Sequence, residues 1–135
     1  MSKIIYLDTE TTGLDKEKND IIQVAGIIGK HVNKFDKTDK FYLAGQNVKF
    51  DLEFLHSWAK KNGDIYLGSY FWWYVIDLYV FTAAAKAWGW YEFETLKLSD
   101  VCKTLKVEIE NAHDALADIE ATKKCIEVFR FAIPF

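Results

Sequence analysis

The sequence predicts a single mixed α/β domain in which a central β-sheet is flanked by helices. Apolar runs of strand length dominate the first 45 residues, whereas apolar residues recur at helical spacing from residue 48 onwards. Strands first and helices later are typical of a sheet covered by helices, and not of a helical bundle or a β-sandwich. A chain of 135 residues can bury one good core, and it shows no repeat or linker.

Three strands are expected in the N-terminal third of the chain. The first covers residues 4–7, an apolar run that ends at a turn signal. Residues 21–28 are almost continuously apolar, which predicts a central strand buried on both faces. Residues 30–40 should form a hairpin turn that leads into a third strand at 41–43. Residues 70–76 also have strand composition, because they are rich in aromatic and β-branched side chains.

Helices are expected in the remainder of the chain. The first should start near Val48 and stop at Asn62-Gly63. Asp77 is expected to cap a second helix, residues 97–105 should form a third, and the last should run from residue 113 or 114 to about 131. The apolar faces consist of Phe50, Phe54, Leu55, Trp58 and Ala59; of Leu98, Val101, Cys102 and Leu105; and of Ala115, Ile119, Thr122, Ile126 and Phe129.

Composition restricts the classes of function. A net charge of −3 argues against a protein that grips nucleic acid through a broad basic face. The two cysteines lack metal-ligand spacing and are expected to be reduced and half-buried in helices. The N-terminus shows no signal-peptide pattern, and Asp77 and Lys86 interrupt the apolar stretch of residues 70–90, which argues against a membrane span. We therefore expect a cytoplasmic protein.

An acid pair follows the first predicted strand. Asp8 and Glu10 are two positions apart, so on an extended backbone both carboxylates point to the same face. Neighbouring carboxylates repel each other unless water or a shared cation surrounds them. Gly13 then allows a sharp turn that leaves the acids at an open edge. Such a pair is common in solvated loops, so its meaning depends on whether other residues converge on it.

Two later segments supply residues that could converge on this pair. Asp51 lies in the first turn of the helix that starts near Val48, where it could be simply a helix-dipole acid, and Asn47 could be simply a cap. His113 and Asp118 would be about 140° apart on one continuous helix. They can meet only if His113 lies in the loop before the last helix. Asp114 is expected to be a helix N-terminal acid without a catalytic role.

Together, and in this order, the three segments resemble the motifs of a known enzyme family. D-T-E-T-T-G-L stands at residues 8–14, N-V-K-F-D-L-E-F-L at 47–55 and H-D-A-L-A-D at 113–118. This set resembles the DEDDh exonucleases, the DnaQ-like superfamily that includes proofreading subunits such as the epsilon subunit of DNA polymerase III. The resemblance spans essentially the whole chain, in a shortened form. It implies a ribonuclease H-like fold.

The resemblance also implies a set of site residues. Asp8, Glu10, Asp51 and Asp118 would bind two Mg²⁺ ions, for which Mn²⁺ would substitute. Asp8 would bridge the ions, Glu10 and Asp118 would complete the first, and Asp51 would hold the second. His113 would act as general base toward the attacking water, since imidazole exchanges protons readily near neutral pH. Substrate contacts are expected from Thr11, Thr12, Leu14, Asn47 and Phe50.

The implied reaction is the stepwise release of nucleoside 5′-monophosphates from a 3′-OH end. Leu14 and Phe50 would pack on the terminal base, and stacking of this kind tolerates any base. If the four acids are neutralised by metal, the remaining 17 basic and 16 acidic residues suit a polyanionic substrate. The first motif favours DNA over RNA. Whether the task is proofreading, end trimming or turnover stays open.

One departure from the family pattern and three alternatives remain. Only 43 positions separate Asp8 from Asp51, where family members usually carry a longer segment with an extra helix. The aromatic residues at 70–74 and 88–93 are expected to be mostly buried, or else to form a substitute cleft wall or a surface for a polymerase or another protein partner. The alternative functions are an exoribonuclease of the same family, a non-catalytic adaptor and a haloacid-dehalogenase-like phosphatase, which would require aspartate in place of Glu10.

Overall fold

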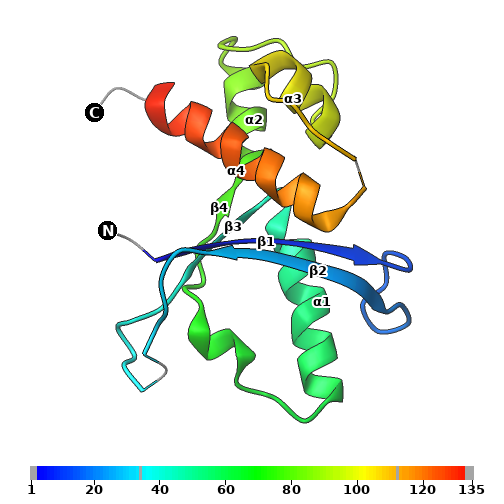
Figure 1. The fold of residues 1–135 in the computed structure, drawn as a ribbon, viewed down its shortest axis with the longest axis vertical. Coiled ribbons are helices and arrows are strands. Elements are labelled where there is room, and N and C mark those ends of the chain that lie inside the picture. Colours follow the sequence, from blue (N-terminus) through cyan, green and yellow to red (C-terminus); the bar gives the residue numbers. More distant parts are fainter. Residues whose placement is uncertain (1–2, 34, 112, 133–135) are drawn as a thin grey trace.

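The computed structural model describes residues 3–33, 35–111 and 113–132. Its central sheet has the strand order β2-β1-β3-β4, in which β1 is antiparallel to β2 and parallel to β3, and β3 is parallel to β4 (Figure 1). The predicted mixed α/β class is confirmed. The elements in chain order are β1 Ile4–Thr11, β2 Ile21–Ile28, β3 Tyr42–Gly45, α1 Val48–Lys61, the short 3₁₀ helix η1 Leu67–Tyr70, β4 Ile76–Asp77, α2 Leu78–Ala87, α3 Leu98–Leu105 and α4 Ala115–Ala132.

Helices cover the two faces of the sheet separately (Figure 1). On one face, Val48 of α1 packs against Leu7 of β1 and Leu43 of β3. On the other face, Ala115 and Ile119 of α4 pack on the sheet. A third and larger cluster joins α2, α3 and α4 to one another and to Ala44 of β3. The bounds of α3 and α4 agree with the prediction to within two residues. Their predicted faces are buried except for the partly buried Leu98, whereas Trp58 on the predicted apolar face of α1 is 55% exposed.

The first strand is longer than predicted. It continues to Thr11 because it pairs with β2 from Ile5 opposite Ile28 to Thr11 opposite Ile21, with a register shift between Glu10 and Thr11. The acid pair therefore lies on the strand itself and not in a loop after it. Alternation along the strand then fixes the directions of the side chains.

The prediction that residues 21–28 form a central strand buried on both faces is wrong. β2 is an edge strand, and Ile22, Val24 and Ile28 are 68%, 52% and 51% exposed. The expected hairpin at residues 30–40 is also wrong, because the chain crosses to the other side of β1 and forms β3 parallel to it. Within the described residues, no strand pairs with the outer edge of β2.

The aromatic segment at residues 70–76 is not a continuous strand. Only Ile76–Asp77 pair as β4, and a single bridge joins Phe41 to Phe71. The rings pack on one another instead: Trp72 and Tyr74 stack with centroids 5.8 Å apart. The expectation that the aromatics of 70–74 and 88–93 are mostly buried is also wrong, since only Phe93 of these residues is buried.

Two further sequence expectations concern cysteines and membranes. Cys102 and Cys125 are free, as predicted, but they are fully buried rather than half-buried, and their sulfur atoms lie 3.6 Å apart between α3 and α4. No helix within the described residues is long and apolar enough to cross a membrane.

Gly45 occupies a crowded position between β3 and α1. A Cβ atom there would lie 2.7 Å from the backbone oxygen of Leu7 and 2.8 Å from the Val48 side chain, which is fully buried. We expect Gly45→Ala to lower the free energy of unfolding by about 2 kcal/mol, because neither neighbour can retreat without disturbing the sheet. Urea denaturation followed by circular dichroism measures this. Gly29→Ala is the control, since its Cβ would meet nothing within 4 Å; equal losses in the two variants would contradict the explanation.

Candidate active site

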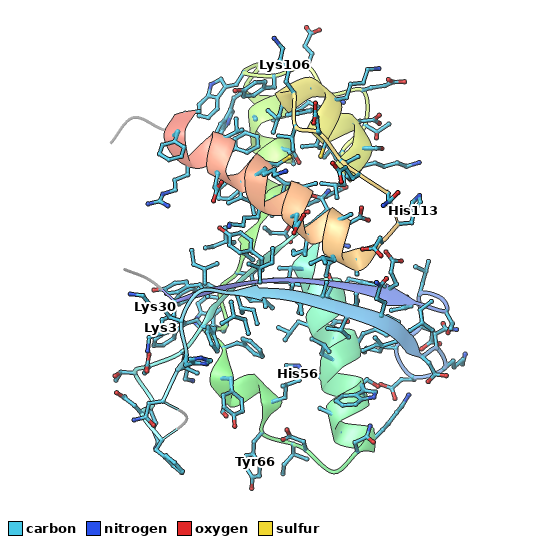
Figure 2. The ribbon with its side chains drawn as sticks, in the orientation of Figure 1. Lys3, Lys30, His56, Tyr66, Lys106 and His113 are labelled. Carbon is cyan, nitrogen blue, oxygen red and sulfur yellow. The ribbon has the colours of Figure 1, made fainter. Side chains whose placement is uncertain are left out.

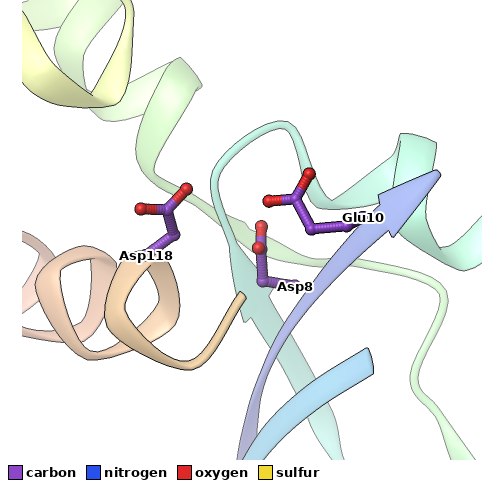
Figure 3. Close-up of side chains that lie close together, drawn as sticks. All are labelled: Asp8, Glu10 and Asp118. Atoms are coloured by element: carbon purple, nitrogen blue, oxygen red, sulfur yellow. The ribbon is translucent and has the colours of Figure 1, made fainter. Parts of the chain in front are cut away.

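Three of the predicted acids meet above the sheet. Asp8, Glu10 and Asp118 each have a carboxylate oxygen within 4.8 Å of the others (Figure 3). Asp8 and Glu10 project from the same face of β1, and Asp118 comes from the first turn of α4. Burial of Ala115 and Ile119 against the sheet holds the start of α4 over β1. The packing of α4 on β1 and β2 therefore assembles the cluster.

Two acids of the cluster, Asp8 and Asp118, have raised pKa values. Burial, followed by the negative charges of Asp51, Asp118 and Glu10 in that order of size, raises the pKa of Asp8 to about 8. Burial also raises the pKa of Asp118, although the backbone and charge of His113 oppose this. Among the described residues, no lysine or arginine forms an ion pair with any of the three clustered acids.

The three acids fit a hard divalent cation. Oδ1 of Asp118 is buried and has no hydrogen-bond partner, which is costly unless a cation coordinates it. All the available donors are carboxylate oxygens, the ligand type that Mg²⁺ and Mn²⁺ prefer. The protein has only two cysteines, and these face each other between α3 and α4, so no thiolate competes for softer metals at this site.

Asp51 lies beside the cluster but is held in a different way. It is 3% exposed in the first turn of α1, and its Oδ1 accepts hydrogen bonds from the backbone N–H of Thr9 at 2.9 Å and from the Thr9 hydroxyl at 2.6 Å. Burial raises the pKa of Asp51 to about 6, against the lowering effect of these bonds. Asp51 is thus a buried neighbour of Asp8 and not a simple surface acid at a helix start. It does not belong to the group of three that could share one ion.

Thr9 is a site residue that the sequence analysis missed. It stands between the two acids of the first motif, where the alternation of the strand turns its side chain away from them and toward α1. Its burial, at 8% exposed, is the consequence. A polar residue at a position that must face the core is the signal that could have identified it.

His113 lies in the loop before α4, as predicted. Its backbone has φ of 73°, so the residue stands outside the helix and the five-residue spacing to Asp118 does not keep the two apart. Figure 2 shows it beside the first turn of α4. His113 and Asp118 line the same cavity of about 440 Å³.

Asp114 has the structural role expected of it. Its Oδ1 accepts hydrogen bonds from the backbone N–H groups of Leu116 and Ala117, which caps α4. The bond from Ala117, followed by one from the Gln23 side chain, lowers the pKa of Asp114. It is therefore a capping residue outside the acid cluster.

The five residues predicted to contact substrate differ in their surroundings. The Thr11 hydroxyl donates to the Gly13 carbonyl, and the Thr12 hydroxyl accepts from the backbone of Asp20, so both already stabilise the turn after β1. Leu14 is 87% exposed. Phe50 packs on Phe54 with ring centroids 4.8 Å apart, and Asn47 lines the same cavity as His113. Their contacts with substrate stay predictions.

Comparison with protein families decides the relationship of the chain. The model of a family described as an exonuclease family, RNase_T, matches residues 30–126, most of the chain. The chain belongs to this exonuclease family. The matched segment contains Asp51, His113 and Asp118 and begins after the acid pair on β1. Membership in the DnaQ-like 3′–5′ exonuclease superfamily, which the motifs indicated, is thereby confirmed.

Solved exonuclease structures share the fold at low identity. A crystal structure of E. coli Exonuclease I with a dT13 oligonucleotide matches with a TM-score of 0.73 and 17% identity over 98% of this chain and 41% of that chain. A zinc-bound form of the E. coli ExoI–ssDNA complex matches with the same TM-score and identity, over 99% of this chain and 41% of that chain. A product-bound exonuclease I structure matches with a TM-score of 0.68 and 14% identity, over 97% of this chain and 44% of that chain.

These matches confirm the ribonuclease H-like fold of this family member. The chain spans about 41% of the length of the Exonuclease I chains that match it with a TM-score of 0.73. No curated protein matches the sequence.

Proposed function

We propose that this family member is a metal-dependent 3′–5′ exonuclease that releases nucleoside 5′-monophosphates from 3′-OH ends, with DNA as the favoured substrate. We further propose that residues 1–135 act as a single exonuclease domain. The observation that carries the proposal is the convergence of Asp8, Glu10 and Asp118, with His113 lining the same cavity as Asp118. The Exonuclease I structures with bound oligonucleotides support DNA as the substrate.

The acids would hold the cation and thereby position the scissile phosphate. Asp8, Glu10 and Asp118 have free carboxylate oxygens close enough to share one divalent ion. When bound, Mg²⁺ would supply positive charge to the phosphorane-like transition state and to the attacking and leaving oxygens. Asp51 would serve a second ion beside Asp8, with Thr9 fixing the orientation of its carboxylate.

His113 would take the proton of the attacking water at its imidazole. It is exposed, precedes α4 and lines the cavity with Asp118, so a water between the two can reach the ring. The four acids alone would be a poor choice for a general base, because each is needed in the ionised form to hold metal. A non-catalytic adaptor would gain nothing from three mutually repelling carboxylates, which the cluster retains at a cost to stability.

The direct test is cleavage of 5′-labelled single strands. Single-stranded DNA and RNA of equal sequence are incubated with the protein and Mg²⁺, and products are resolved on a denaturing gel. A ladder that shortens from the 3′ end and disappears with EDTA is expected, and DNA should be shortened faster than RNA. A folded sample that cleaves neither strand with Mg²⁺ or Mn²⁺ would refute the proposal.

His113→Ala should separate proton transfer from metal binding. We expect the cleavage rate to fall by about a hundredfold or more, because a general base typically contributes that much. Mg²⁺ affinity, measured by calorimetry, should stay close to that of the unmodified protein, since the carboxylates are intact. His56→Ala is the matched control: His56 is also exposed, but it lies on α1 near Gly68. A parallel loss of Mg²⁺ affinity in His113→Ala would show that the residue is a ligand instead.

A further inference from the structure

A groove continues from the active site along the surface. The cavity of about 440 Å³ that contains His113 and Asp118 shares two lining residues, Asn47 and Tyr79, with a second cavity of about 450 Å³. The second cavity extends along β4 and α2 to Trp73. Because both cavities are lined by Asn47 and Tyr79, they are neighbours, and we treat them as one groove with Asp118 and His113 at one end and the exposed indole of Trp73 at the other.

The far end of this groove presents unusually exposed aromatic rings. Trp73 is 84% exposed and Tyr79 is 46% exposed. Trp73 contacts Tyr74 edge-to-face, with ring centroids 5.4 Å apart, and Tyr74 in turn stacks on Trp72. The indole is therefore supported from one side and remains open to solvent. Exposed rings of this kind are the surfaces on which the bases of single strands stack.

The charges along the groove suit a phosphate backbone. Lys97 lines the first cavity and Lys49 the second. Apart from Asp118 and His113 of the active site, the remaining charged lining residue is Asp77, which is only 8% exposed. Its Oδ1 already accepts the N–H groups of Asn47 and Tyr79, so its charge is engaged inside the protein.

The helices also turn their N-termini toward the groove. Asn47 immediately precedes α1, Tyr79 lies in the first turn of α2, and residues 97–99 begin α3. The positive ends of helix dipoles add to the two lysines in favouring an anionic ligand. These termini support the groove as a nucleic-acid surface, and the lysines and aromatics on its walls carry the inference.

We propose that this groove binds the nucleotides on the 5′ side of the cleaved end of a single strand, and that a base stacks on Trp73. The inference rests on the proposed exonuclease function, which it extends from the reacting phosphate to the path of the strand. Contact through stacking and phosphate charge makes binding independent of sequence. It also makes binding dependent on length, because an oligonucleotide too short to leave the active site never reaches Trp73.

Trp73→Ala tests the stacking contact against a matched control. Another exposed tryptophan, Trp88, is 64% exposed and packs on Trp90 in the turn after α2, outside both cavities. We expect Trp73→Ala to lower kcat/KM for dT8 about tenfold, a typical loss for one base stack, and to leave dT2 unchanged. Trp88→Ala should change neither, and Trp73→Phe should restore part of the loss.

Binding measurements distinguish failure of this inference from failure of the proposed function. Binding of 5′-fluorescein dT8 is measured by fluorescence anisotropy with variants that also carry Asp118→Asn, so that the oligonucleotide is not degraded and the readout does not depend on cleavage. Weaker binding in Trp73→Ala alone supports the groove even if the protein proves to cleave nothing. Cleavage with equal dT8 affinity in the Trp73→Ala and Trp88→Ala variants would overturn the groove while leaving the nuclease intact, and the surface would then suit a protein partner.

The lysine contact gives an independent readout. Each phosphate neutralised by a lysine releases condensed counterions, so binding weakens with salt. Lys49→Gln should reduce the slope of log affinity against log salt for dT8 by about 0.7, the value for one contact on a single strand. An unchanged slope would remove Lys49 from the proposed path.

Discussion

Asp118→Asn is expected to lower the exonuclease rate by about a thousandfold or more. The substitution removes a carboxylate from the cluster that would hold the cation, and a loss of several kcal/mol of charge stabilisation corresponds to such a factor. Asn has nearly the same shape, so α4 should stay in place. Initial rates on 5′-labelled single-stranded DNA with saturating Mg²⁺ measure the effect.

A measurement of thermal stability would test whether unfolding causes this loss of rate. Asp118 raises the pKa of Asp8 through its negative charge, so neutralising Asp118 relieves repulsion in the metal-free protein. The variant should therefore melt no lower than the unmodified protein in EDTA. Asp114→Asn is the control: the same change four residues earlier alters a capping residue, for which Asn is an acceptable substitute, and should leave the rate nearly unchanged. A rate retained in Asp118→Asn would contradict the assignment of the ligand.

The metal-free protein is expected to lose stability as pH rises from about 4 to about 8. The folded protein keeps a proton on Asp8 up to a pKa of about 8 and on Asp51 up to about 6, whereas both carboxyls ionise near 3.8 when unfolded. The unfolded state therefore binds fewer protons in this interval, and stability must fall with rising pH. This loss of stability is absent at pH values below the pKa of the unfolded state and complete at pH values above the pKa of the folded state. Thermal melts in EDTA across this range measure the slope.

Mg²⁺ should reverse this trend. A cation favours the ionised carboxylates and competes with protons, so its stabilising effect should grow as pH rises from 5 to 8. Asp36, Asp39 and Asp114 have lowered pKa values and change stability only at more acidic pH, outside this interval. Asp8→Asn should flatten the slope in EDTA and abolish most of the Mg²⁺ effect. An undiminished Mg²⁺ effect in that variant would place the ion elsewhere.

The site was more predictable from the sequence than the sheet was. Helix starts have local signals, so the positions of Asp118 inside α4 and His113 before it follow from caps and apolar spacing. An apolar run has no such signal for its place in a sheet. Residues 21–28 form an edge strand because of where the chain goes after them, and that route is set by the crossover to β3 and not by their own pattern.

Long-range polar contacts were the other limit. The hydrogen bond between Thr9 and Asp51 joins residues 42 positions apart, and neither motif alone indicates that the two residues bond to each other. The prediction of a strand at residues 70–76 was wrong for a related reason. Its composition suits a strand, but Trp72 and Tyr74 stack on each other and make tilted ring contacts with Tyr42, which replaces the strand pairing that composition predicts.

The Thr9–Asp51 contact has a consequence for the choice of cation. Both hydrogen bonds from Thr9 end on Oδ1 of Asp51, so Oδ2 would be the oxygen more accessible to a cation. Ca²⁺ usually takes six to eight oxygens and relies on bidentate carboxylates, whereas Mg²⁺ accepts six ligands and keeps several waters. If Asp51 holds a cation as proposed, Thr9 would limit the oxygens that it can offer, and we would expect Mg²⁺ to be bound in preference to Ca²⁺.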